Sequence, residues 1–148
     1  MKLRQTAVLL TAALLVLSLS SCAKKDDTLK DGYYNAQLSD DQYGWKEYVT
    51  IMVKGGQVVT VEYNAKNESG FIKSWDNRYM QTMLQAQGTY PNEYTRYYAS
   101  QLIGATDVPH VDVISGATAS YNTFQKLMVA VIDQAKKGDS TLAIVPAE

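Results

Sequence analysis

The apolar and polar positions in the first half of the chain alternate with a period of two residues. In residues 45–54, WKEYVTIMVK, one face is formed by Trp45, Glu47, Val49, Ile51 and Val53. This alternation is typical of a half-buried strand. Gly55 and Gly56 follow and fit a tight hairpin turn, after which residues 57–66 return as the partner strand. With the short aromatic-led run at residues 32–38, the pattern predicts two or three antiparallel strands.

The second half of the chain has helical spacing. A helix is predicted over about residues 75–86, with Met80, Met83 and Leu84 on one side. Pro91 suits the first turn of a second helix, PNEYTRYYASQLI, which Gly104 ends. A third helix is predicted over residues 117–135 and stops at Gly138. Its amphipathic face consists of Tyr121, Phe124, Met128, Val131, Ile132 and Ala135.

The order of these elements predicts the fold class. Residues 140–146, STLAIVP, indicate a last strand that could pair on the sheet. Strands, then helices, then a final strand are the order of an α+β domain. We therefore expect a small antiparallel sheet packed with helices in one compact domain, residues 31–148.

The N-terminal residues indicate export. Lys2 and Arg4 precede an apolar run at residues 7–19 that is too short for an ordinary membrane span, so residues 1–21 are predicted to be a signal peptide. The run ends in LSLSSC, which has the form of a bacterial lipobox. Cys22 is then the lipidated N-terminus, residues 22–30 are a polar tether, and the protein is anchored to the extracytoplasmic face of the cell membrane. A plain secretory signal with an incidental cysteine is the alternative.

Composition excludes several functions. The chain has 14 Lys and Arg against 15 Asp and Glu, and two basic residues leave with the signal peptide. This weakly acidic balance argues against a nucleic-acid partner. With Cys22 lipidated and His110 the only histidine, no cysteine nucleophile, iron–sulfur cluster or multi-histidine metal site is available. We therefore expect no catalytic residues and no metal ligands, and a chemistry supplied by a cofactor.

The segment DVISGATASY stands at the start of the last helix. Ser115 is predicted to be its N-cap, which would place Gly116, Ala117 and Thr118 in the first turn. Amide groups there lack helical partners, and the helix dipole favours a phosphate. Gly116 and Ala117 would leave room for a bulky group to reach the Thr118 hydroxyl. From spacing alone, a purely structural helix cap remains open.

The spacing Asp112-x-x-Ser115-Gly116-Ala117-Thr118 resembles the acceptor motif of the FMN-binding domain family, which includes flavinylated subunits of the sodium-translocating NADH:quinone reductase. Residues 31–37, 44–70 and 72–80 also resemble the front half of that family, so the resemblance covers roughly residues 31–135. It implies that Thr118 carries FMN as a phosphoester. A magnesium-dependent flavin transferase would install it from FAD outside the cytosol.

The resemblance also implies neighbours for the flavin. Asn67, Glu68, Gly70 and Ser74 lie in a turn whose family counterpart approaches the flavin, and a solvated loop is the alternative. Asp112 either positions the acceptor hydroxyl or the metal of the transferase, or only begins the turn. Candidate walls for the flat ring are Trp45, Trp75, Tyr79 and Tyr121. The triplet Gly104-Ala105-Thr106 repeats the motif without its serine, and Thr106 is not expected to be an acceptor.

These observations predict an exported, membrane-anchored electron carrier. Its FMN would take electrons from an upstream membrane donor and pass them to a quinone, another flavoprotein or an extracellular acceptor. Two alternatives remain: a lipoprotein that binds a ligand or partner without redox chemistry, and a small flavin-dependent reductase. The reductase would need a proton donor, such as His110 or a tyrosine.

Overall fold

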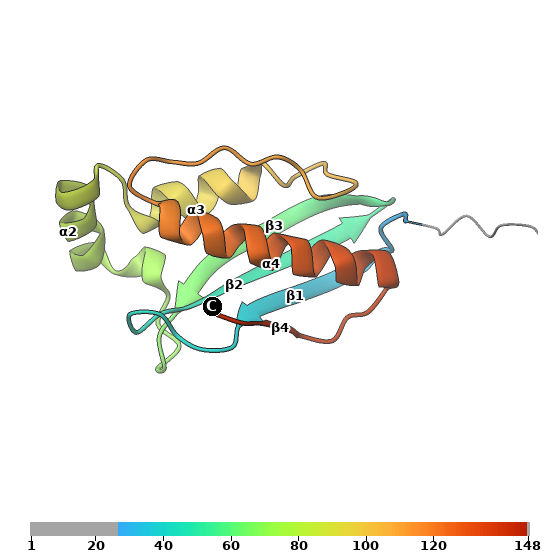
Figure 1. Cartoon of the computed structure of the whole chain (residues 1–148), viewed down its shortest axis with the longest axis horizontal. Helices are drawn as coiled ribbons and strands as arrows, with labels where there is room; N and C mark the ends of the chain where they lie inside the picture. The colour runs from blue at the N-terminus through green and yellow to red at the C-terminus, as the bar shows by residue number, and fades with distance from the viewer. Residues whose placement is uncertain (1–26, 148) are drawn as a thin grey trace, which may run out of the picture.

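The computed structural model describes residues 27–147, which form one α+β domain (Figure 1). The predicted signal peptide, Cys22 and the first part of the predicted tether lie outside the described residues. The elements are β1 (Gly32–Leu38), β2 (Lys46–Lys54), β3 (Gln57–Lys66), η2 (Lys73–Trp75), α2 (Asn77–Gln87), α3 (Pro91–Ser100), α4 (Thr118–Lys137) and β4 (Ala143–Val145). Within residues 27–147, none of the helices combines the length and apolar character needed to cross a bilayer.

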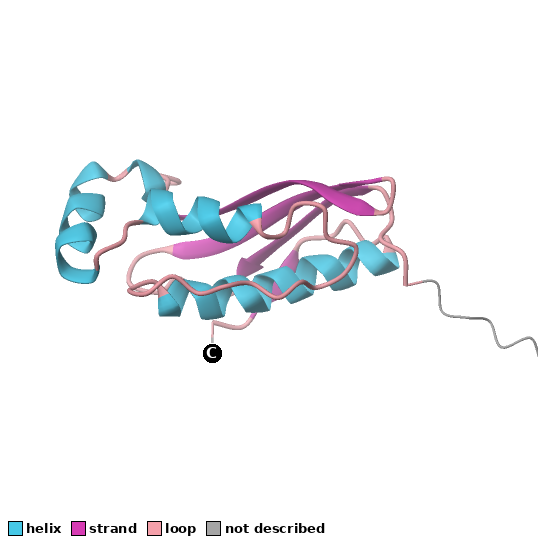
Figure 2. Ribbon diagram, turned by 90° about the horizontal axis from the view of Figure 1, so that it is seen from above, coloured by secondary structure: helices cyan, strands magenta, loops and turns pink. Residues whose placement is uncertain are grey.

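The four strands form one sheet in the order β3-β2-β1-β4. β1, β2 and β3 pair antiparallel, as the alternation predicted, whereas β4 pairs parallel to β1. The sheet is therefore mixed. α4 lies across one face of the sheet, on β1 and β2, and α3 packs on β3 (Figures 1 and 2).

The hairpin between β2 and β3 confirms the predicted turn. Gly55 and Gly56 both have positive φ, 63° and 76°, which a two-residue hairpin turn of type I′ requires. β2 buries Val49, Ile51 and Val53 against the helices. The predicted face of α4 meets them with Phe124, Met128, Val131, Ile132 and Ala135, all buried, while Tyr121 is half-buried. Full burial of each large side chain contributes about 1.5–3 kcal/mol.

All three α-helices differ from their predicted limits, and α4 spans Thr118–Lys137 rather than residues 117–135. α2 begins at Asn77 because the Asp76 side chain accepts a hydrogen bond from the Tyr79 amide at 2.9 Å, and η2 precedes it. No residue of α2 is fully buried: Met83 is partly buried against the core, whereas Leu84 is 49% exposed. α3 ends at Ser100, before the predicted end.

The Gly104-Ala105-Thr106 triplet, which resembles the end of the acceptor motif, takes part in backbone hydrogen bonds with β3. The amide of Gly104 donates to the Val58 carbonyl at 2.7 Å, and the amide of Val58 donates to the Ala105 carbonyl at 2.9 Å. Residues 104 and 105 therefore extend the hydrogen bonding at the outer edge of β3.

Candidate functional site

The residues before Thr118 form a tight turn. The Ala117 amide donates to the Ile114 carbonyl at 3.1 Å, and Gly116, the third residue of the turn, has φ 83°. These features define a type II turn, here called the acceptor turn, residues 114–117. The N-cap of α4 is Ala117, without a side-chain cap. The prediction that Ser115 caps the helix was wrong, because the positive φ at Gly116 turns the chain before the helix begins.

The space above Gly116 is filled by the end of α2. A Cβ atom at this position would lie 2.3 Å from the carbonyl oxygen of Gln87. Glycine is therefore required by both its backbone conformation and this close approach. The expectation that Gly116 leaves room for a bulky group is corrected: the room is taken by another part of the chain.

Tyr98 on α3 anchors both ends of the acceptor turn. Its hydroxyl accepts a hydrogen bond from the Ile114 amide at 3.1 Å and donates to the Ala117 carbonyl at 3.3 Å. The Tyr98 ring is fully buried and stacks on Phe124 of α4, with the ring centroids 5.7 Å apart. The position of the turn is thus fixed from within the core.

Thr118 is the first residue of α4, and its side chain is exposed. Among residues 27–147, no hydrogen bond is made to its hydroxyl. The Tyr121 amide bonds the Ala117 carbonyl at 2.9 Å, so the amides of residues 118–120 precede the first bond of the helix. These amides and the positive end of the helix dipole surround a free hydroxyl, an arrangement that suits a phosphate.

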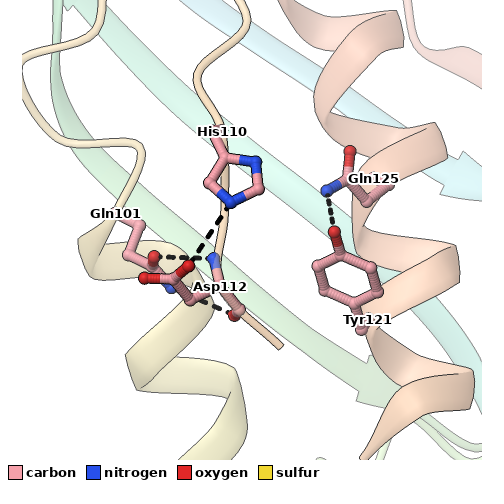
Figure 3. A network of polar contacts seen from close by, with 5 residues as sticks. All are labelled: Gln101, His110, Asp112, Tyr121 and Gln125. Carbon is pink, nitrogen blue, oxygen red and sulfur yellow. Dashed lines mark hydrogen bonds and ion pairs between the residues drawn. The ribbon is translucent and has the colours of Figure 1, made fainter. Parts of the chain in front are cut away.

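Asp112 lies on the loop before this turn (Figure 3). Its carboxylate is 3.4 Å from Nε2 of His110, and its amide donates to Oε1 of Gln101 at 2.9 Å. In the same view, Tyr121 on α4 accepts a bond from Gln125 at 2.7 Å. The carboxylate of Asp112 thus contacts an exposed histidine rather than the Thr118 hydroxyl.

The turn after β3 has its own internal bonding. Oδ1 of Asn67 accepts from the Phe71 amide at 2.9 Å and from Oγ of Ser69 at 2.8 Å, and Gly70 has φ 82°. Glu68 is exposed, and Ser74 is buried with its Oγ bonded to Asn64 at 2.8 Å. Within residues 27–147, no hydrogen bond joins Asn67, Glu68, Gly70 or Ser74 to the acceptor turn. Their proposed contact with a flavin stays a prediction.

A buried polar cluster, to which the sequence analysis assigned no role, lies beneath the first turn of α4. Glu47 of β2 is only 9% exposed. Its Oε1 accepts from Oγ of Ser120 at 2.9 Å, and its Oε2 accepts from the Tyr63 hydroxyl at 2.8 Å. The only signal in the sequence was an acidic residue on the same strand face as Val49 and Ile51.

Burial governs the ionisation of this cluster. It raises the pKa of Glu47, while hydrogen bonds from Tyr63, Ser120 and Thr123 and the positive charge of Lys73 act in the opposite direction. It also raises the pKa of Tyr63, to which the neighbouring Glu47 adds. The cluster thus holds a carboxyl group that gains proton affinity on folding.

Lys73 joins two of the four predicted aromatic walls. It is 8% exposed, and its Nζ lies 4.9 Å from the ring centroid of Tyr79 and 5.9 Å from that of Trp45. These two rings meet edge to face at 6.2 Å. The other two candidates are separate: Trp75 is 67% exposed against Phe71, and Tyr121 packs on Tyr98.

Two hollows of similar volume lie on the described part of the protein. One, of about 670 Å³, lies beside the first turns of α4 and is lined by Gln42, Tyr43, Ala119, Asn122, Thr123, Gln125, Lys126 and Ala147. The other, of about 640 Å³, lies between α3 and β3. Tyr43 is 99% exposed and has φ 55°, a strained conformation for an aromatic residue. No group of three or more His, Cys, Asp or Glu in residues 27–147 is placed to hold a metal ion.

Comparison with known proteins identifies the family. The family model described as FMN-binding domain matches residues 43–133, which include β2, β3, the acceptor turn and most of α4. The chain belongs to this family, and FMN is the cofactor that the match supports.

Two relatives match over most of their length. The 15 kDa lipoprotein of Treponema pallidum is 31% identical over 134 residues, 90% of this chain and 94% of the relative. The crystal structure of the CPE2226 protein from Clostridium perfringens is 34% identical, covers 81% of this chain and 99% of that one, and superposes with a TM-score of 0.76. The fold is therefore shared with a solved structure at 34% sequence identity.

Proposed function

We propose that the protein is an exported, lipid-anchored flavoprotein that carries FMN covalently on Thr118 and transfers electrons. One observation carries the proposal: a free, exposed hydroxyl begins a 20-residue helix, α4, in a member of the FMN-binding domain family. This hydroxyl contributes no hydrogen bond to the stability of the fold, because no described residue bonds to it.

The residues present fit an attached phosphate. Oγ1 of Thr118 would attack the phosphorus of the FMN half of FAD, the phosphoanhydride bond would break, and AMP would leave. The hydroxyl proton would pass to the transferase or to water. The free amides of residues 118–120 would then bond the phosphate oxygens, while Tyr98 keeps the acceptor turn in place.

We propose that several other side chains hold the rest of the cofactor. The buried ammonium of Lys73 lies against the rings of Trp45 and Tyr79, and no acidic side chain within residues 27–147 forms a salt bridge with it. An ammonium group in this setting suits the carbonyl edge of a flavin. Ser115, Gly116 and Ala117 shape the acceptor turn. Asp112, Asn67, Glu68, Gly70 and Ser74 remain proposed neighbours of the cofactor.

FMN supplies electron transfer, and the protein supplies orientation and attachment. A covalent bond keeps the cofactor at a high local concentration outside the cell membrane, where lost FMN is not readily replaced. Lipidation of Cys22 would keep the carrier beside a membrane donor, with a quinone or an extracellular protein as acceptor. The Treponema relative, which is itself named a lipoprotein, supports this anchor.

The test is the mass of the protein made with its export signal in cells that contain a flavin transferase. We expect the added mass of one FMN phosphoester and flavin absorbance that survives denaturation. Thr118→Ala should lose both. Thr106→Ala is the matched control, because it removes the threonine of the second Gly-Ala-Thr triplet and should keep both.

Wild-type protein without added mass under these conditions would refute the proposal, and so would flavin retained in Thr118→Ala. Electron transfer has a separate readout. Loaded protein reduced by dithionite should be reoxidised by a soluble quinone. Loaded protein that a quinone leaves reduced would contradict the quinone as acceptor.

A further inference from the structure

If the carboxyl group of Glu47 is ionised, one of the two short contacts between the Tyr63 hydroxyl and neighbouring oxygen atoms has no hydrogen atom. The Tyr63 hydroxyl lies 2.8 Å from Oε2 of Glu47 and also 2.8 Å from the carbonyl oxygen of Ser120. A tyrosine has one hydroxyl hydrogen and cannot donate a full bond to both oxygens. A proton on Oε2 removes the conflict: Glu47 then donates to Tyr63, and Tyr63 donates to Ser120.

We propose that Glu47 is a proton-binding site linked to the redox state of the flavin on Thr118, an inference that rests on the proposed function. The link is short. Oε1 of Glu47 accepts from Oγ of Ser120 at 2.9 Å, and Ser120 lies two residues after Thr118 on α4. The carboxyl group is therefore bonded to the first turn of the acceptor helix.

Groups from four elements face Glu47, and burial outweighs the hydrogen bonds and the positive charge that lower its pKa. α3 contributes Tyr94 and Tyr98, β3 contributes Tyr63, and η2 contributes Lys73. α4 presents only the hydroxyls of Ser120 and Thr123. Lys73 is the one positive charge among these groups, and its Nζ is not within salt-bridge distance of Glu47. Burial is the largest influence, and it disfavours the charged carboxylate.

The coupling between reduction of the flavin and protonation of Glu47 is electrostatic. An electron added near the acceptor helix raises the proton affinity of a buried carboxylate close by. The electron comes from an external low-potential reductant, the proton comes from water, and the only bond that forms at Glu47 is Oε2–H. On reoxidation both leave. By linkage, protonation of Glu47 must favour electron uptake to the same extent.

The experiment is a redox titration of loaded wild type, Glu47→Gln and Glu62→Gln from about pH 4 to about pH 9. Glutamine keeps the shape of Glu47 and removes its charge. Wild type should have a lower reduction potential than Glu47→Gln at high pH. The two curves should converge at low pH, where Glu47 carries a proton in both oxidation states.

Glu62 is the matched control, because it is an exposed acidic residue on the neighbouring strand β3. Glu62→Gln should follow the wild-type curve at every pH. Parallel wild-type and Glu47→Gln curves would overturn the proposal, since a purely structural role could shift the potential but not its pH dependence.

A second measurement avoids variants that fail to fold. Carbon-13 NMR of the Glu47 carboxyl in the wild type should give a pKa that is higher in fully reduced protein than in oxidised protein by on the order of one pH unit. An equal pKa in both states refutes the coupling. Failure of the proposed function is distinguishable, because wild-type protein would then show no FMN in its mass spectrum.

Discussion

The hydroxyl of Tyr98 donates to the carbonyl oxygen of Ala117, the residue immediately before Thr118, at 3.3 Å. The same hydroxyl accepts a hydrogen bond from the amide of Ile114 at 3.1 Å, so one buried oxygen from α3 holds both ends of the acceptor turn. A position at the protein surface is thereby fixed by a side chain in the core.

Tyr98→Phe should destabilise the protein by about 1–3 kcal/mol, because it leaves the Ile114 amide and the Ala117 carbonyl without this partner. Urea unfolding measures the change. Tyr97→Phe is the control: Tyr97 is the neighbouring tyrosine, partly exposed, and no residue of 27–147 bonds its hydroxyl. It should change the free energy of unfolding by less than about 0.5 kcal/mol. Equal losses in both variants would contradict the anchoring role.

Gly116→Ala should cost about 2–4 kcal/mol, because it combines a left-handed backbone with a clash against the Gln87 carbonyl. Gly104→Ala separates the two effects. Gly104 has φ 84° and open space around its Cα, so this variant should cost only about 1 kcal/mol. Thermal or urea unfolding of both proteins gives the difference, and similar costs would show that the contact with Gln87 is unimportant.

Two hydroxyls on the first turn of α4 should behave differently. Thr118→Ala should change the free energy of unfolding by less than about 0.5 kcal/mol, because no described residue bonds that hydroxyl. Ser120→Ala should cost about 1–3 kcal/mol, because it removes a donor from the buried Glu47. Unfolding of flavin-free protein is the appropriate measurement. A large loss in Thr118→Ala would reveal a structural role for the Thr118 hydroxyl.

The stability of flavin-free protein should fall as the pH rises through the folded pKa of Glu47. Burial raises this pKa above that of the unfolded chain, ~4.3. The folded state therefore binds the proton more tightly, and this contribution is full below the unfolded pKa and is lost as the pH rises through the folded one. Glu47→Gln should lack this decline, whereas Glu62→Gln should keep it. Urea unfolding midpoints, measured as the pH rises from below the unfolded pKa through the folded pKa of Glu47, test this prediction.

Tyr43→Asn should leave stability unchanged or slightly raised. The side chain is almost fully exposed, and asparagine adopts the backbone conformation at φ 55° more readily than tyrosine does. Since Tyr43 lines the hollow beside Ala119, it is a candidate to cover the flavin ring. Flavin fluorescence of the loaded variant should then increase. Unchanged fluorescence would assign Tyr43 no role at the cofactor.

Much of the fold was predictable because its signals are local. The alternation in residues 45–54 and 57–66 and the Gly55-Gly56 turn gave the central hairpin, and the helical spacing after Thr118 gave the core face of α4. The parallel pairing of β4 was not predictable, since a strand of three residues carries no sign of the direction of its partner.

The site was predictable only in part. The spacing of Asp112, Ser115, Gly116 and Thr118 indicated an acceptor motif, and the role of these residues stays a prediction, although the chain belongs to the FMN-binding domain family. The motif did not show that Ser115 lies in a turn or that Gly116 faces Gln87. Glu47 looked like one more position on a strand face, because its partner Ser120 is 73 residues away.

The sequence by itself determined the strand and helix periods, the Gly-Gly hairpin and the threonine at the start of α4, because each depends on residues a few positions apart. Only the tertiary structure decided the direction of β4, the filling of the space at Gly116 and the proton-binding arrangement around Glu47. These features depend on which distant backbone or hydroxyl group arrives at a position when the chain packs, and no local pattern of residues records that.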